Sequence, residues 1–135
     1  RLAGVSIGAP GIVTLLDADH DWWVGVRNFE VVLGRPLDIE AIRRVPVHTV
    51  VGEADTQTWE IRLTPESSWW MPGAERLAEA NRRERIAALA RSLQDHGVNV
   101  ASDVAPGAAH DGFAMLPAVE RWFSGVLAGL RRDRA

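Results

Sequence analysis

Residues 45–55 read VPVHTVVGEAD. The β-branched run from Val45 to Gly52 predicts a buried strand, with Pro46 near its start because proline has no N–H to donate. Asp55 follows three residues after the glycine that ends this run. In open α/β sheets, ligand-binding and catalytic groups gather beyond the carboxyl ends of strands. Asp55 is therefore a candidate functional acid; the alternative is that it caps a turn through the amides that follow it.

Two further apolar runs predict strands elsewhere in the chain. Residues 2–9 (LAGVSIGA) end at Pro10-Gly11, a strong breaker pair. Residues 98–105 (VNVASDVA) alternate and then meet a second breaker pair, Pro106-Gly107. Together with the run at 45–52, these segments predict three strands.

Helical spacing appears in two segments between and after these strands. Residues 74–96 carry an apolar stripe and predict one long helix, which Gly97 ends. Pro117 fits the first turn of a final helix. Strands that alternate with helices of this length predict a parallel α/β sheet with flanking helices. Residues 11–44 fit no single element and predict a short cap-like insertion over one end of the sheet.

Composition limits the classes of protein to which this chain belongs. It has 135 residues, of which 47% are hydrophobic and 24% charged, as in a globular domain. Its formal charge of −3 argues against a nucleic-acid partner. The absence of Cys excludes disulfides and thiolate metal sites, and no apolar run reaches the ~18 residues of a membrane span. Together with the lack of a signal peptide, these features favour the cytoplasm.

A second candidate group follows the third predicted strand. Residues 106–113 read PGAAHDGF, and the small neighbours of His110 leave its imidazole free to project into a cleft. Histidine exchanges a proton near neutral pH. Because Asp55 and His110 both follow strands of one parallel sheet, we expect them at the same edge. The alternative is an inert histidine in an exposed loop.

Three other polar features favour structural roles. Residues 4–8 (GVSIG) match G-x-S-x-G, but Pro10-Gly11 would stop the helix that a nucleophile elbow needs, so Ser6 is predicted to be a strand residue. His48 lies within a predicted strand and reads as a core histidine. The run Asp17–Asp21 around His20 lacks the remaining positions of a calcium loop, and we expect neither a metal nor a cofactor.

The chain is rich in tryptophan outside its predicted elements. Such residues either pack beneath long loops or wall an apolar substrate pocket, and the sequence leaves both readings open. The candidate substrate-binding residues are Trp22, Trp23, Trp59, Trp69 and Trp70.

In their order and spacing, these segments resemble the C-terminal half of an α/β-hydrolase of the serine esterase or lipase type. Residues 1–11 resemble the sixth-strand segment, which ends in Gly-Ala-Pro. Residues 47–55 resemble the seventh strand with its Gly-x-x-Asp ending, and residues 98–110 the eighth strand with its Gly-x-x-His loop. The final helix resembles the C-terminal helix that packs on the sheet. The resemblance therefore covers residues 1–135 as the C-terminal portion of one domain.

This resemblance implies a serine hydrolase that cleaves a small-molecule carboxylic ester. Asp55 would be the acid and His110 the base, in the family order Ser…Asp…His. The nucleophile and the oxyanion hole would lie in an N-terminal half of the domain, upstream of Arg1. That half would also pair with the apolar strand at 2–9. Without the nucleophile and the oxyanion donors, residues 1–135 alone would be inactive. A homo-oligomer is compatible with the sequence.

The alternative is a non-catalytic α/β module, or a hydrolase-like binding scaffold in which Asp55 and His110 are incidental. The sequence that precedes Arg1 would separate the two hypotheses. A strand followed by G-x-S-x-G and a helix there would favour hydrolysis. Fold alone does not choose between ester, amide and carbon–carbon bond cleavage.

Overall fold

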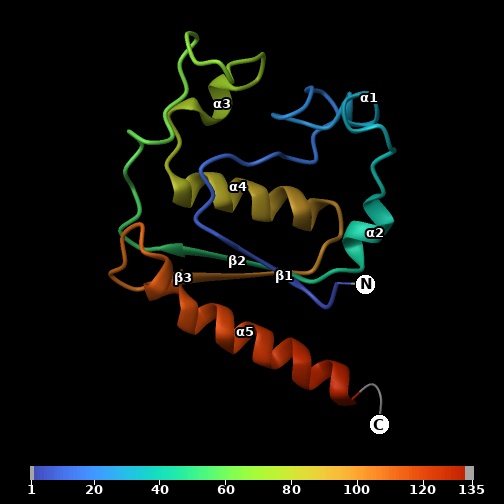
Figure 1. Ribbon diagram of the computed structural model, residues 1–135, viewed down its shortest axis with the longest axis vertical. Helices are drawn as coiled ribbons and strands as arrows, with labels where there is room; N and C mark the ends of the chain where they lie inside the picture. Colours follow the sequence, from blue (N-terminus) through green and yellow to red (C-terminus); the bar gives the residue numbers. More distant parts are fainter. Residues whose placement is uncertain (1, 133–135) are drawn as a thin grey trace.

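A computed structural model describes residues 2–132 and places three strands in one parallel sheet (Figure 1). The strands are β1 (Val5–Gly8), β2 (Val47–Gly52) and β3 (Val100–Ala105), and each lies inside one of the predicted runs. Their order is β1-β2-β3, and both pairings are parallel. The predicted fold class is therefore confirmed.

Two long helices, α4 (Arg82–Asp95) and α5 (Gly112–Arg132), cover opposite faces of the sheet (Figure 1). Every residue of the central strand β2 is buried. Its side chains alternate between the two helices: Val47 packs in a cluster with Leu93 of α4, whereas His48 stacks on Trp122 of α5. This double burial explains the nearly continuous apolar run of the strand.

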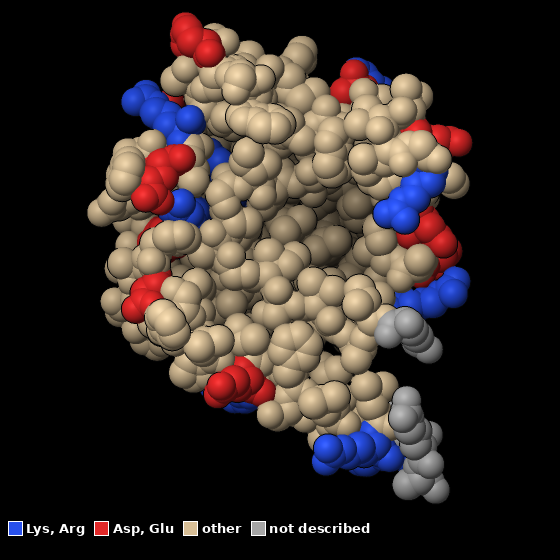
Figure 2. All heavy atoms as spheres, viewed as in Figure 1, with Lys and Arg blue, Asp and Glu red and all other residues tan. Residues whose placement is uncertain are grey.

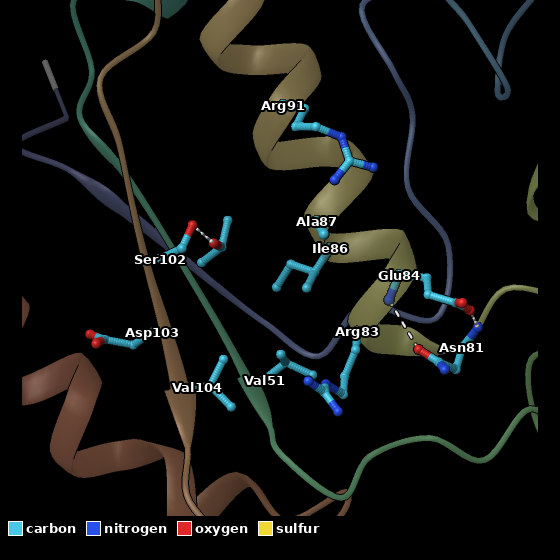
Figure 3. A pocket seen from close by; sticks show the side chains of 11 residues that line it. Val51, Asn81, Arg83, Glu84, Ile86, Ala87, Arg91, Ser102, Asp103 and Val104 are labelled. Atoms are coloured by element: carbon cyan, nitrogen blue, oxygen red, sulfur yellow. Dashed lines mark hydrogen bonds between the residues drawn. The ribbon is translucent and has the colours of Figure 1, made fainter.

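The prediction of one helix over residues 74–96 is wrong at its start. The segment forms a short α3 (Glu75–Ala78), and α4 begins only at Arg82. Asn81 caps α4 because its side chain accepts from the Glu84 N–H at 3.0 Å, while the Glu84 carboxylate accepts from the Asn81 N–H at 2.8 Å (Figure 3). This reciprocal capping box starts a new helix and separates it from α3.

The final helix also begins earlier than predicted. We expected Pro117 in its first turn, but α5 starts at Gly112, five residues before the proline. Asp111 explains the earlier start, because its Oδ1 accepts from the Phe113 N–H at 2.9 Å and the Ala114 N–H at 3.4 Å. A side chain that satisfies the free N–H groups of a first turn fixes where the helix begins.

Apart from α4 itself, the segments that connect the strands form an outer layer over α4 (Figure 1). They contain α1 (Phe29–Leu33), α2 (Ile39–Arg43) and α3, and Asp38 caps α2 by accepting from the Ala41 N–H at 2.8 Å. This layer has its own buried cluster, made of Val13, Trp23, Val24, Leu63, Ala74, Leu77 and Ala78. The layer lies on the side of α4 that faces away from the sheet, and its segments follow β1 and β2 in the chain (Figure 1).

His48, in the central strand β2, contacts polar side chains of both outer strands, β1 and β3. Its side chain is 0% exposed, with Nδ1 2.9 Å from Ser6 Oγ and Nε2 3.1 Å from Asp103 Oδ2. Ser6 lies in regular strand β1 and not in a strained turn, so the elbow that a serine nucleophile requires is missing there. The predictions of a core histidine and a strand serine agree with this arrangement.

Charged side chains are spread around the margin of the face shown in Figure 2, with both signs interspersed. That face therefore carries no basic patch of the kind that nucleic-acid binding uses. Within residues 2–132, no helix is both long enough and apolar enough to cross a membrane.

The Asp17–Asp21 loop provides a pH-dependent contribution to stability. A hydrogen bond from the Asp19 N–H, followed by contacts with Arg76 and His20, lowers the pKa of Asp17 from 3.8 to about 2. A depressed carboxyl pKa stabilises the fold above the unfolded-state pKa, and this contribution is lost as pH falls from ~4 to ~2. We expect Asp17→Asn to lower the free energy of unfolding by about 1 kcal/mol at neutral pH, because solvent screens the contacts of this surface carboxylate.

Urea unfolding at a series of pH values measures this effect. The Asp17→Asn variant and the unaltered protein should converge below about pH 2, where the carboxyl is protonated in both states. A deficit that stays constant down to that pH would show that the carboxylate charge is not its source.

Candidate active site

The loops that follow β2 and β3 are joined by backbone hydrogen bonds. The Glu53 N–H donates to the Ala105 carbonyl at 2.9 Å, and the Ala54 N–H donates to the Ala108 carbonyl at 2.7 Å. The Glu53 carboxylate accepts from the Gly107 N–H at 2.8 Å. Each strand therefore delivers its loop to the same edge of the sheet, and the two loops are held in register.

Gly52 makes this close approach possible. A Cβ at this position would lie 2.2 Å from the Ala109 carbonyl oxygen and 2.4 Å from that of Ala108. Both atoms belong to backbone, which cannot move aside as a flexible side chain would. The glycine that ends β2 therefore lets the histidine loop pack directly against the acid loop.

We expect Gly52→Ala to displace the loop that carries His110 and to lower the free energy of unfolding by about 1–3 kcal/mol, since an added methyl group in closely packed surroundings has effects of that size. The measurement is urea unfolding. Gly112→Ala is the matched control, because nothing lies within 4 Å of its Cβ position and its φ lies outside the range that favours glycine. Equal losses in the two variants would contradict this role for Gly52.

The two candidate residues Asp55 and His110 are in direct contact. His110 Nδ1 lies 2.9 Å from Asp55 Oδ2. The Asp55 side chain is only 2% exposed, whereas that of His110 is 51% exposed. Because a carboxylate only accepts hydrogen bonds, the hydrogen of a neutral His110 ring lies on Nδ1. Nε2 is then left as a free acceptor, which is the arrangement of a general base oriented by a buried acid.

A second ion pair adjoins the buried acid. Arg82, the first residue of α4, places Nη1 3.7 Å from Asp55 Oδ1 and Nη2 2.9 Å from Glu60 Oε2. No sequence pattern marks Arg82 or Glu60 as a site residue. Arg82 is buried because the segment around Glu60 folds over the start of α4, and helical spacing does not predict this contact.

These side chains line a hollow of about 280 Å³ at the edge of the sheet. Asp55, Arg82 and His110 lie beside Trp59, whose side chain is 73% exposed. The remaining lining residues are Ala54, Gln57, Glu60 and Ala109. The hollow thus combines one oriented acid–base pair with an indole surface, a combination that suits binding of an apolar group next to a reacting one.

The other tryptophans predicted to bind substrate lie in different surroundings. Trp23 is buried in the core of the outer layer and donates from Nε1 to the Trp69 carbonyl at 2.9 Å, and Trp70 packs against the same cluster. Trp22 contacts Phe29 edge to face. Trp69 is exposed and lines a neighbouring hollow that shares Glu60 with the one at His110. The structure therefore brings Trp59, and not Trp22, Trp23 or Trp70, to the acid–base pair.

A larger hollow, of about 510 Å³, lies between α4 and strands β2 and β3 (Figure 3). Its floor is apolar, and Thr49 and Ser102 are hydrogen-bonded to each other across it at 2.8 Å. Arg83 and Arg91 lie along its α4 side. No histidine lines it, so it holds no acid–base pair like that of Asp55 and His110. Among residues 2–132, no three His, Asp or Glu side chains gather to hold a metal ion.

A scan against protein-family models gives no match, and no curated protein matches the sequence. Two solved structures have a similar fold. Poly(aspartic acid) hydrolase-1 from Sphingomonas sp. KT-1 has a TM-score of 0.66 and 18% sequence identity, covering 90% of this chain and 45% of its own. LpqC, a poly(3-hydroxybutyrate) depolymerase from Bordetella parapertussis, has a TM-score of 0.62 and 23% identity, covering 90% and 41%.

The chain spans less than half the length of either solved structure. At sequence identities of 18% and 23%, the similarity concerns the fold alone. Three parallel strands in the order β1-β2-β3, with helices on both faces, agree with that likeness. This chain has the fold of the C-terminal part of an α/β-hydrolase.

Proposed function

We propose that this chain supplies the acid and the base of a serine hydrolase that cleaves carboxylic esters. The observation that carries the proposal is the hydrogen bond between His110 Nδ1 and Asp55 Oδ2, made by loops beyond neighbouring parallel strands. The order Asp…His, with each residue following a parallel strand, matches the order of the acid and base in the α/β-hydrolase fold, and this agreement supports the proposal. The likeness to a hydrolase and a depolymerase supports the same reading.

In the proposed reaction, the nucleophile is a serine in a segment N-terminal to this chain, which pairs with the free edge of β1. His110 Nε2 takes the serine proton as Oγ bonds to the ester carbonyl carbon. The carbon–oxygen bond to the alcohol then breaks, and Nε2 returns the proton to the departing alcohol. Water hydrolyses the acyl-enzyme by the same proton path. Asp55 holds the Nδ1–H tautomer and stabilises the imidazolium throughout.

We further propose that the ester is uncharged near its reacting carbonyl. The hollow is lined by two carboxylates, Asp55 and Glu60, and one guanidinium, Arg82, so its formal charge is −1 with His110 neutral, and Glu60 is the more exposed of the two carboxylates. A carboxylate repels an anionic substrate, and the exposed indole of Trp59 favours an apolar group. Of the substrates named for the two similar structures, a neutral polyester such as poly(3-hydroxybutyrate) fits these groups better than poly(aspartic acid).

Replacement of Asp55 tests the proposal. We expect Asp55→Asn, in the protein that contains this chain, to lower kcat for p-nitrophenyl butyrate by about 10³–10⁴-fold, because an amide no longer selects the Nδ1–H tautomer. Asp111→Asn is the matched control: Asp111 neighbours the base, but it caps α5, and asparagine is an equally good cap. Equal activity of both variants would contradict a role for Asp55 in a triad, and an absence of ester hydrolysis in the unaltered protein would favour a binding scaffold.

A further inference from the structure

Arg82 is a buried cation beside the candidate acid. Its side chain is 8% exposed, and among the described residues its Nε is a buried polar atom without a hydrogen-bond partner. Burial of a guanidinium with one N–H unsatisfied costs free energy that an apolar side chain of similar size would avoid. Stability alone therefore does not account for an arginine at this position.

The geometry around Asp55 suggests what the cation does. The carboxylate has two oxygens: Oδ2 faces His110 Nδ1 at 2.9 Å, and Oδ1 faces Arg82 Nη1 at 3.7 Å. If the carboxylate rotated about its Cβ–Cγ bond, both contacts would be lost together. The attraction at Oδ1 therefore opposes the rotation that would turn Oδ2 away from the imidazole.

The position of Arg82 is itself fixed from two directions. It is the first residue after the cap of α4, where the reciprocal hydrogen bonds of Asn81 and Glu84 set the backbone. At the other end of the side chain, Nη2 donates to Glu60 Oε2 at 2.9 Å. Nearby Arg85 carries a second buried positive charge, and repulsion between the two guanidinium groups favours an Arg82 orientation toward the two carboxylates.

We propose that Arg82 is a positioning residue, which holds Asp55 Oδ1 so that Oδ2 orients His110 as the base. The inference rests on the proposed function for its kinetic consequence. Its structural consequence, the tautomer of His110, is independent of any activity. The guanidinium acts through Asp55 and touches no reacting atom.

Ring-nitrogen NMR of His110 at about pH 9, where imidazole is neutral, measures the tautomer directly. The unaltered protein should show the Nδ1–H tautomer. In Arg82→Met and Arg82→Gln, we expect a substantial fraction of the Nε2–H tautomer. We also expect kcat for the ester to fall by about tenfold to a hundredfold while KM changes by less than about twofold, since the lost interaction concerns orientation of the base and not substrate binding.

Glu60→Gln is the matched control, because it removes the charge opposite Nη2, keeps an oxygen that can accept its hydrogen bond, and leaves the contact of Nη1 with Asp55. It should keep the Nδ1–H tautomer. A native tautomer in either folded Arg82 variant overturns the inference, and so does a Glu60→Gln variant that loses the tautomer to the same extent. The glutamine variant keeps a polar side chain, so the test does not depend on the folding of Arg82→Met.

The two proposals fail in different ways. If the protein hydrolyses no ester but the Arg82 variants change the tautomer, the proposed function is wrong and the positioning role stands. If hydrolysis depends on His110 but the tautomer and kcat are unaffected by Arg82 replacement, the positioning role is wrong and the proposed function stands.

Discussion

Replacement of His110 with alanine is expected to lower kcat for ester hydrolysis by about 10⁴–10⁶-fold, the range seen when the base of a serine triad is removed. The other three histidines, His20, His48 and His96, are engaged elsewhere, and His20 Nδ1 lies 2.8 Å from Asp17 Oδ2 in the outer layer. His48 is fully buried between Ser6 and Asp103, and the Nδ1 of His96 lies 2.7 Å from the Ser92 carbonyl oxygen at the end of α4. The measurement is the initial rate with a chromogenic ester at saturating concentration.

His96→Ala is the control for this prediction, because His96 sits at the C-terminal end of α4, whereas Arg82 at the N-terminal end adjoins the candidate site. Its kcat should stay within about threefold of the unaltered protein, since it touches no reacting group. An active His110→Ala variant would remove the base from the proposed mechanism and leave the Asp55 contact as a structural one.

The second large effect is expected on stability, at Arg85. This side chain is 1% exposed and donates to carbonyl oxygens of three separate segments: Gly11 through Nη1, Ile61 through Nη2 at 2.8 Å, and Ala80 through Nε at 2.9 Å. Burial, and then the charge of Arg82, lowers the pKa of Arg85. The guanidinium therefore ties the outer layer to α4.

We expect Arg85→Met to lower the free energy of unfolding by about 3–5 kcal/mol, because it fills similar space but leaves several buried carbonyls without donors. Urea unfolding measures the loss. Arg83→Met is the control: Arg83 is exposed and makes one hydrogen bond, to the Glu53 carbonyl, so its loss should stay below about 1 kcal/mol. Similar losses at the two positions would show that Arg85 does not tie the layers together.

Much of the sheet and the central pair could be predicted from sequence, because both follow from local patterns. The apolar runs mark strands, and the glycines that end them mark the sheet edge where Asp55 and His110 lie. Two parallel strands that pair directly must bring their following loops together. The contact between the two residues is therefore a consequence of topology.

The helix boundaries were misjudged although the sequence carries their signals. Asn81 followed three residues later by Glu84 is a capping-box pattern, and it overrides the apolar stripe that continues through it. Asp111 is likewise an N-cap, and it starts α5 before Pro117. In both cases a side-chain hydrogen bond sets the boundary, which neither the apolar stripe over 74–96 nor Pro117 marks.

The buried arginines and the separate surroundings of the tryptophans could not be predicted from local patterns. Arg82 and Arg85 are buried because segments distant in sequence cover them, and the composition of α4 resembles that of an exposed helix. Trp23 and Trp59 both lie in turns outside the helices and strands but have opposite burial, since one faces the core of the outer layer and the other lies on the surface. Tertiary packing decides these outcomes.

The central claim is that Asp55 and His110 serve a serine that lies N-terminal to this chain. Fluorophosphonate labelling of the protein that contains the chain, followed by peptide mapping, tests it most directly. We predict one labelled serine, within a G-x-S-x-G sequence upstream of Arg1, and loss of labelling when that serine is replaced by alanine or when His110 is. Labelling at Ser6, labelling that persists without the upstream serine, or an absence of labelling would contradict the account.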